Sequence, residues 1–92
     1  MDWSSFVSAA TATNWYAYLG TADGAGRAHV SVVAPGFTEG SVWFATRTES
    51  KKFRNIGENP GVGFHWPIGG QGPGELAAWG TAAWARAVLL GS

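Results

Sequence analysis

Short runs of β-branched and aromatic residues, each closed by glycine or proline, fill most of this sequence. The clearest is RAHVSVVA, residues 27–34, in which side chains alternate between two faces, so that Val30 and Val32 share one of them. A period of two residues is typical of a β-strand. The stretch 22–26 before this run contains glycine and aspartate, and Pro35-Gly36 follows it, so turns are predicted on both sides. We therefore expect short strands joined by tight connections.

Further elements follow from the same patterns. Strands are predicted over residues 14–22, 41–46, 61–67 and 75–84, a helix over 3–10, and a turn over 36–40. The alanines of residues 75–84 would also allow a helix there. The best helix candidate covers residues 49–59, where Phe53 and Ile56 lie on one side and Asn59-Pro60 ends the helix. Four or five antiparallel strands with a helix after the third predict a mainly β fold with one or two short helices, arranged as a small barrel.

Composition excludes several classes of function. Six acidic residues balance six basic ones in 92 residues, which argues against broad electrostatic binding of nucleic acid or of an anionic membrane. There is no cysteine, so no disulfide or thiolate metal site can form. No apolar run approaches the ~20 residues of a membrane-spanning helix. Asp2 stands where a signal peptide would carry positive charge, so a cytoplasmic protein is expected.

Four of the six basic residues lie within positions 47–54, in the sequence RTESKKFR. If Thr48 or Ser50 caps the helix, Lys51 and Lys52 fall in its first turn, where the helix dipole disfavours cations. A bound anion would reverse that effect, because free N–H groups, hydroxyls and ammonium groups would all point at it. Two interpretations stand at this point. One is a phosphate site where a strand meets a helix; the other is a solvated helix face, which the charge pattern alone favours.

The order of the motifs adds a family resemblance. ADGAGRAHV, VWFAT, ESKK and NIGENPGVGF follow one another along the chain. In this order and spacing they resemble the pyridoxamine 5′-phosphate oxidase-like superfamily of flavin-binding split β-barrels. Each motif is weak alone, and the match covers about half of the chain closely. The resemblance implies a single flavin-binding split β-barrel domain over residues 1–92.

The same resemblance implies a cofactor, FMN or in some branches the deazaflavin F420, held at the interface of a homodimer. Four side chains would hold the flavin phosphate: Thr46, Ser50, Lys51 and Lys52. Three residues would line the isoalloxazine ring, mostly through their backbone: Val32, Val33 and Ala45. The implied activity is that of a flavin-dependent oxidoreductase with an unknown substrate, and no catalytic side chain is assigned.

Several positions depart from the pattern of true pyridoxamine phosphate oxidases. Val30 and Pro35 stand roughly where those enzymes carry an arginine and a lysine near the flavin. Glu75 corresponds to a glutamine that contacts the flavin. The sequence stops at Ser92, before the segment that binds pyridoxal phosphate in those enzymes. We therefore expect a shortened member that lacks the last elements of the family fold and does not oxidise vitamin B6.

Other chemistry is sparse in this sequence. His29 and His65 are its only histidines, and no further ligands stand at matched spacing, so no metal site is predicted. Four tryptophans could stack on a flavin or a planar substrate, namely Trp43, Trp66, Trp79 and Trp84, but we expect them to pack in the core or at a dimer interface. Two other functions stay open. The chain could be a non-enzymatic carrier of flavin, F420 or haem, or a degenerate barrel without cofactor. It could also be an unrelated β-barrel interaction module whose basic cluster is merely solvated.

Overall fold

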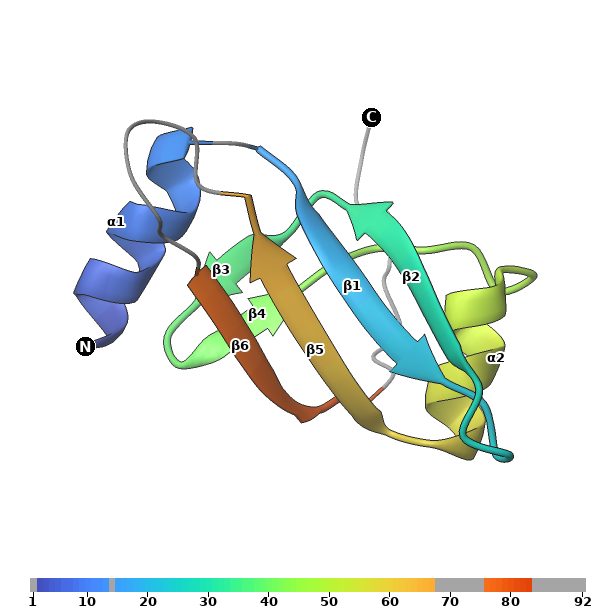
Figure 1. Cartoon of the computed structure of the whole chain (residues 1–92). Coiled ribbons are helices and arrows are strands. Elements are labelled where there is room, and N and C mark those ends of the chain that lie inside the picture. The colour runs from blue at the N-terminus through green and yellow to red at the C-terminus, as the bar shows by residue number, and fades with distance from the viewer. Residues whose placement is uncertain (1, 14, 68–75, 84–92) are drawn as a thin grey trace, which may run out of the picture.

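The computed structural model describes residues 2–13, 15–67 and 76–83, and Figure 1 shows how the elements in that part of the chain are arranged. In chain order they are α1 (Trp3–Thr13), β1 (Ala17–Ala22), β2 (Ala28–Val33), β3 (Gly36–Thr38), β4 (Ser41–Trp43), α2 (Lys51–Glu58), β5 (Gly61–Trp66) and β6 (Leu76–Thr81). Strands β2, β1, β5 and β6 form one antiparallel sheet in that order, while β3 and β4 pair as a separate antiparallel hairpin. The predicted mainly β fold with two short helices is confirmed.

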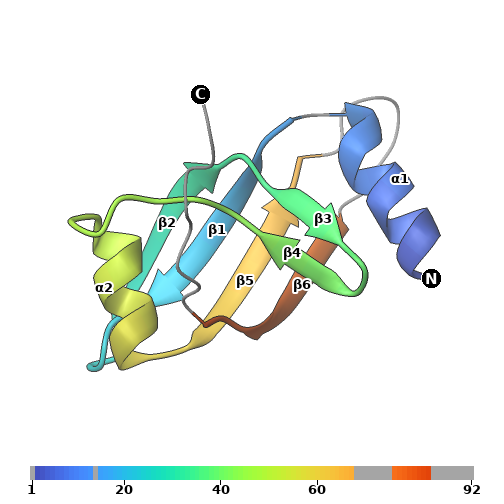
Figure 2. The same cartoon turned by 180° about the vertical axis from the view of Figure 1, so that it is seen from behind.

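The two sheets form a split-barrel arrangement that is not closed across the described residues. Seen from behind in Figure 2, the hairpin β3–β4 and helix α2 lie over one face of the four-stranded sheet. The described parts of β4 and β6 do not pair with each other, so each leaves an edge open. Helix α1 packs at one end through Phe6, whose ring lies 6.2 Å from that of Phe37 on β3.

Strand β3 was missed by the sequence analysis, which predicted a turn over residues 36–40. Gly36–Thr38 instead pair with β4, and only the stretch after Thr38 turns, with Gly40 at a φ of +75°. The indole of Trp43 lies over Gly36, where any Cβ would collide with the ring. Its Nε1 also donates a hydrogen bond to Thr38 Oγ1 at 3.1 Å. This short strand therefore depends on its partner rather than on its own sequence.

Other boundaries differ from prediction by a few residues. Helix α1 continues to Thr13 rather than ending near residue 10, and β1 begins at Ala17 rather than at residue 14. Strand β4 ends at Trp43, so residues 44–46 belong to the connection that leads to α2. The ends of the predicted strand 75–84, Glu75 and Trp84, and the loop 68–74 lie outside the described residues.

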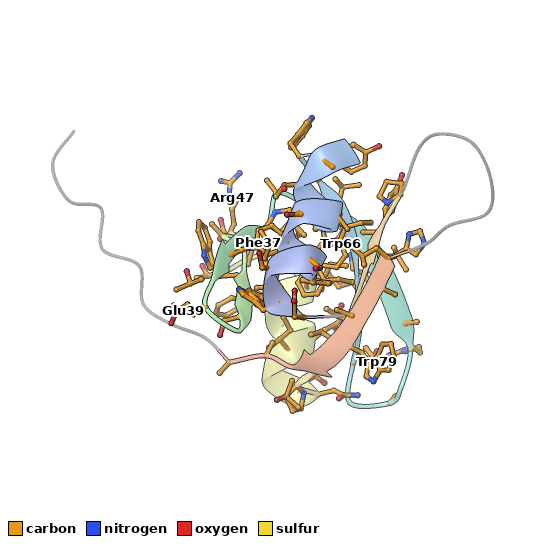
Figure 3. The ribbon with its side chains drawn as sticks, turned by 90° about the vertical axis from the view of Figure 1, so that its left-hand side faces the viewer. Phe37, Glu39, Arg47, Trp66 and Trp79 are labelled. Atoms are coloured by element: carbon orange, nitrogen blue, oxygen red, sulfur yellow. The ribbon has the colours of Figure 1, made fainter. Side chains whose placement is uncertain are left out.

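The core lies between the four-stranded sheet and the elements behind it. Leu19 and Trp66 are completely buried, and Phe64 is 8% exposed. The ring of Trp66 contacts Phe6 and Phe37 at centroid distances of 5.2 and 6.1 Å, and Figure 3 shows Phe37 and Trp66 toward the middle of the molecule. Burial of each large apolar side chain contributes roughly 1.5–3 kcal/mol to folding. Trp66 therefore links the helix, the hairpin and the main sheet.

The other face of the sheet, called the outer face below, is covered by no described element (Figure 1). Cross-strand pairing aligns two rows of residues on it, Val32–Tyr18–His65–Ala77 and Val30–Gly20–Gly63–Trp79. Val30 is 65% exposed, Val32 52% and Trp79 84%. The alternation predicted for residues 27–34 is confirmed, but its valine stripe points to the outer face, while Val33 is buried in the core.

The turn between β1 and β2 is organised by one carboxylate. Asp23 Oδ1 accepts hydrogen bonds from the backbone N–H groups of Ala25 and Arg27, each at 2.9 Å. Its Oδ2 accepts a third from the Arg27 guanidinium, also at 2.9 Å. The backbone hydrogen bond from Arg27 is the main reason why the pKa of Asp23 lies below its ordinary value. Gly26, at a φ of +84°, supplies the backbone conformation that the turn requires.

Candidate functional site

Two hydroxyl groups meet at the N-terminus of α2. Ser50 has extended backbone angles, and its Oγ accepts a hydrogen bond from the backbone N–H of Phe53 at 3.2 Å, so it is the N-cap predicted from the sequence. Thr46 Oγ1 lies 2.9 Å from Ser50 Oγ, and both residues are partly buried. The connection after β4 therefore returns to the helix and brings together two of the four predicted phosphate-binding residues.

Lys51 and Lys52 open the helix, as the sequence analysis predicted. Lys51 is exposed and Lys52 is partly buried, and the first turn contains no acidic residue. Within the described part of the chain, neither ammonium group forms an ion pair. The helix dipole places about half a positive charge at the same end. Lys51, Lys52 and the helix dipole thus all place positive potential at this end of the helix, and neither ammonium group is paired with a described carboxylate.

Backbone donors are also free at this terminus. The N–H groups at the start of a helix have no partner inside the helix. Ser50 Oγ accepts a hydrogen bond from the backbone N–H of Phe53, and the backbone carbonyl of Ser50 accepts one from the N–H of Arg54 at 3.3 Å. No described residue accepts a hydrogen bond from the backbone N–H of Lys51 or Lys52. Two backbone donors therefore remain next to the paired hydroxyls, which suits a tetrahedral oxyanion.

The remaining basic residues of the cluster are placed differently. Arg47 is 87% exposed and pairs loosely with Glu49 at 3.7 Å, and Figure 3 shows it projecting from the surface. Arg54 is exposed on α2. An exposed ion pair of this kind contributes little to stability. These two arginines match the solvated helix face that was the other interpretation of the sequence.

The three residues predicted to line a flavin ring lie on two other segments. Val32 and Val33 are the last residues of β2, a strand that packs against α2, and Ala45 is exposed between β4 and Thr46. Val33 points its side chain into the core, so it could offer a ligand only its backbone. The hydrogen bonds that unite Thr46 with Ser50 do not extend to these residues. The structure therefore assembles the phosphate half of the predicted site more completely than the ring half.

Helix α2 is anchored by a buried polar contact that the sequence analysis missed. Asn55 is 2% exposed, and its Nδ2 donates a hydrogen bond to Thr21 Oγ1 on β1 at 3.1 Å. Ile56 beside it is also buried. A faint signal was present, because asparagine is a poor helix former and here adjoins the apolar side of the helix. This contact fixes the position of the helix and hence of its N-terminus.

A cleft lies apart from the N-terminus of α2, between α1, β4 and β6. It is an open, largely apolar cleft of about 920 Å³, lined among others by Trp3, Phe6, Val42, Phe44, Phe64 and Leu76. The cleft follows the open edges of the two sheets and was not foreseen from the sequence. It holds no cluster of titratable groups, since Asp2 is the one ionisable residue among its described lining residues.

Two classes of site find no support in the described residues. No group of three or more His, Asp or Glu side chains is placed to hold a metal ion. His29 and His65 lie on opposite faces of the sheet, because β2 turns His29 toward the core side and β5 turns His65 outward. Neither described helix is long and apolar enough to cross a membrane.

Comparison with known proteins supports the family suggested by the motifs. The family model described as pyridoxamine 5′-phosphate oxidase matches residues 7–89. This range includes all the predicted cofactor-binding residues and all strands of the described fold. A search among curated proteins returned no match. A match over so much of the chain shows the family independently of any single motif. This chain belongs to the pyridoxamine 5′-phosphate oxidase family.

Proposed function

We propose that this protein is a small flavin-binding oxidoreductase that binds FMN at a homodimer interface. The family suggests a flavin-binding fold, and the N-terminus of α2 supplies the observation that carries the proposal. Two lysines without a described ion pair, two backbone N–H groups without a described acceptor and a pair of hydroxyls lie there within residues 46–52. A phosphate ester would turn this unfavourable concentration of positive potential into a favourable one.

Each group has a distinct part in holding the phosphate. The ammonium groups of Lys51 and Lys52 neutralise its charge, and the backbone N–H groups at the helix start donate to its oxygens. One hydroxyl of the Thr46–Ser50 pair can donate to the phosphate while it accepts from the other. Because Ser50 Oγ already accepts a hydrogen bond from the N–H of Phe53, that hydroxyl is held in one orientation.

Redox chemistry would come from the cofactor. A bound flavin supplies hydride transfer, and the protein contributes binding and orientation. Val32, Val33 and Ala45 are proposed to support the ring through their backbone. The deazaflavin F420 also carries a phosphate group and is the alternative ligand of the same site. A protein that binds either cofactor without turnover would be a carrier rather than an enzyme.

A comparison of two double variants tests the phosphate assignment. Lys51→Ala/Lys52→Ala removes two positive charges from the first turn, and Arg47→Ala/Arg54→Ala removes the same charge from flanking positions. Loss of hydrogen bonds to a charged group costs roughly 1.5–3 kcal/mol each, so the lysine variant should bind FMN at least ~10-fold more weakly. Riboflavin, which lacks the phosphate, should bind both variants and the wild type equally. Equal FMN affinity in the two double variants would disprove the assignment.

A further inference from the structure

One side of the core forms the wall of the apolar cleft between α1, β4 and β6. Ile56, Phe64 and Leu76 are buried, and each of them also lines this cleft. Around them lie further apolar side chains that are only partly buried, namely Phe6, Val42, Phe44, Val62 and Ala78. The cleft is therefore an opening into the core rather than a patch on the surface. An apolar cover over it would stabilise the fold.

Open edges of two strands border the same cleft. Among the described residues, β4 pairs only with β3, and β6 pairs only with β5. The backbone N–H of Ala82 donates a hydrogen bond to Pro60 O at 2.8 Å, so the even-numbered residues of β6 bond to β5. Backbone groups alternate in direction along an antiparallel strand, so those of Ala77, Trp79 and Thr81 point to the open edge.

These two features together select the chemistry of an occupant. A lipid or an aromatic small molecule could fill an apolar cleft of about 920 Å³, but it would leave the backbone donors and acceptors of the strand edges unused. An extended peptide uses both features, because its side chains fill the cleft while its backbone pairs with an edge. The cleft therefore fits an apolar peptide in an extended conformation.

A peptide of this kind follows directly after β6 in the sequence. Ala83 lines the cleft and is the last described residue, so residues 84–92 are attached at the cleft itself. Their sequence is WARAVLLGS, in which every side chain up to Leu90 is apolar except that of Arg86. Nine extended residues reach up to ~30 Å, whereas the six-residue strand β6 is ~20 Å long. The segment is thus long enough to cross the cleft.

We propose that residues 84–90 occupy the cleft of their own chain as an extended segment that covers the core and pairs with an open strand edge. This inference does not rest on the proposed function. Attachment to β6 gives the segment an effective concentration on the order of millimolar, which favours it over a free peptide. Charge is compatible as well. Arg86 is the one ionisable side chain of the segment, and Asp2, of opposite sign, is the one ionisable residue among the described lining residues.

Paramagnetic relaxation enhancement in the full chain tests where the segment lies. The sequence has no cysteine, so Val88→Cys provides a single site for a nitroxide label. Amide signals of the cleft residues Val42, Phe44 and Ala78 should lose more intensity than that of His29 on β2, the strand farthest from β6 in the sheet. The matched control is a nitroxide at Val30→Cys, on the outer face of β2, which should give the reverse pattern.

A mixing experiment separates the segment of the same chain from that of a second copy. Nitroxide-labelled chains without isotope are mixed with isotope-labelled chains that carry no nitroxide. The proposal predicts no loss of intensity at the cleft residues in this mixture. Losses at the cleft that appear in the mixture would place the segment of a second copy there and overturn the proposal. Equal losses at the cleft and at His29 in the chain labelled at residue 88 would overturn it too.

Two double variants test the cover by an independent measurement. Leu89→Asp/Leu90→Asp adds two charges to the apolar run, and Gly91→Asp/Ser92→Asp adds the same charges just beyond it. Carboxylates are disfavoured in an apolar cleft, so the leucine variant should bind a dye for exposed apolar surface with several-fold higher fluorescence and should unfold at lower urea concentration. The control variant should behave like the wild type. Equal dye fluorescence and equal urea midpoints in the two variants would contradict the proposal. If the leucine variant does not fold, the relaxation experiment decides alone.

Discussion

The side-chain amide of Asn55 on α2 donates a hydrogen bond to the hydroxyl of Thr21 on β1 across 3.1 Å, and both side chains are buried. These residues lie 34 positions apart in the sequence, so the contact ties the helix to the central part of the sheet. The candidate phosphate site begins one turn earlier on the same helix. Its geometry therefore depends on a hydrogen bond that no ligand would touch.

Asn55→Ala should lower the free energy of unfolding by roughly 1–3 kcal/mol, because it leaves the Thr21 hydroxyl buried without a partner. Urea denaturation measures the change. Arg54→Ala, at the exposed neighbouring position, is the control and should change stability by less than ~0.5 kcal/mol. Adding Thr21→Val to Asn55→Ala should cost little more, since the hydrogen bond is already lost. Equal stabilities of the Asn55 and Arg54 variants would show that the contact contributes nothing.

Ser50→Asp separates the capping role of this residue from its proposed role in phosphate binding. Aspartate caps helices as well as serine does, and its charge suits the helix N-terminus, so stability should stay the same or rise by up to ~1 kcal/mol. The same carboxylate would repel a phosphate a few ångströms away and should weaken FMN binding by at least ~10-fold. Thermal denaturation and FMN titration of one sample give both results. Unchanged FMN affinity would place the phosphate elsewhere.

Trp66→Ala should be among the most damaging substitutions in the core. The side chain is fully buried and contacts rings from α1, β3 and β5. Removal of a buried large aromatic costs roughly 3–5 kcal/mol, a large part of the ~5–15 kcal/mol that stabilises a domain. Guanidinium denaturation followed by tryptophan fluorescence would measure it. In dilute monomer, Trp79→Ala should cost less than ~0.5 kcal/mol, and a similar loss for both would contradict the described burial.

Stability should decline on the acid side because of Asp23. Hydrogen bonds from Arg27 and Ala25 hold the folded-state pKa of this carboxyl below its ordinary value. The unfolded chain therefore binds more protons in acid, so the stabilisation is complete above the unfolded pKa and is lost as pH falls through the folded one. Free energies of unfolding, measured from neutral pH to below ~pH 4, should fall less steeply for Asp23→Asn than for the wild type. Parallel curves would show that Asp23 does not contribute.

Local signals explain why several elements could be predicted from the sequence. Strand β5 shows a clean alternation that ends in Trp66, and α2 carries a serine cap and an Asn-Pro stop. Strand β3 has no such signal. Its three residues are held by pairing with β4 and by the indole above Gly36, which are contacts between segments. The alternation in β2 predicted that its side chains divide between two faces of the sheet. Which of these faces lies in the core, and so buries Val33, depends on the elements that pack against the sheet.

In the candidate site, too, some features follow from the local sequence and others depend on contacts between segments. Ser50 could be predicted as the cap, and Lys51 and Lys52 as first-turn residues, because helix boundaries are local. The hydroxyl contact between Thr46 and Ser50 depends on where β4 ends, which the sequence analysis placed at Thr46 itself. The anchor formed by Asn55 and Thr21 joins distant segments and could not be read from either one alone. The roles of these residues toward a flavin stay predictions.

Titration of FMN and riboflavin into the full-length protein, followed by flavin fluorescence and visible absorbance, tests the central claim most directly. We predict saturable binding of FMN, with at least ~10-fold weaker binding of riboflavin, because only FMN offers the phosphate that the helix N-terminus is proposed to hold. F420 in a parallel titration identifies the alternative cofactor. Equal binding of FMN and riboflavin would contradict the phosphate site, and failure to bind either FMN or F420 would contradict the proposed function itself.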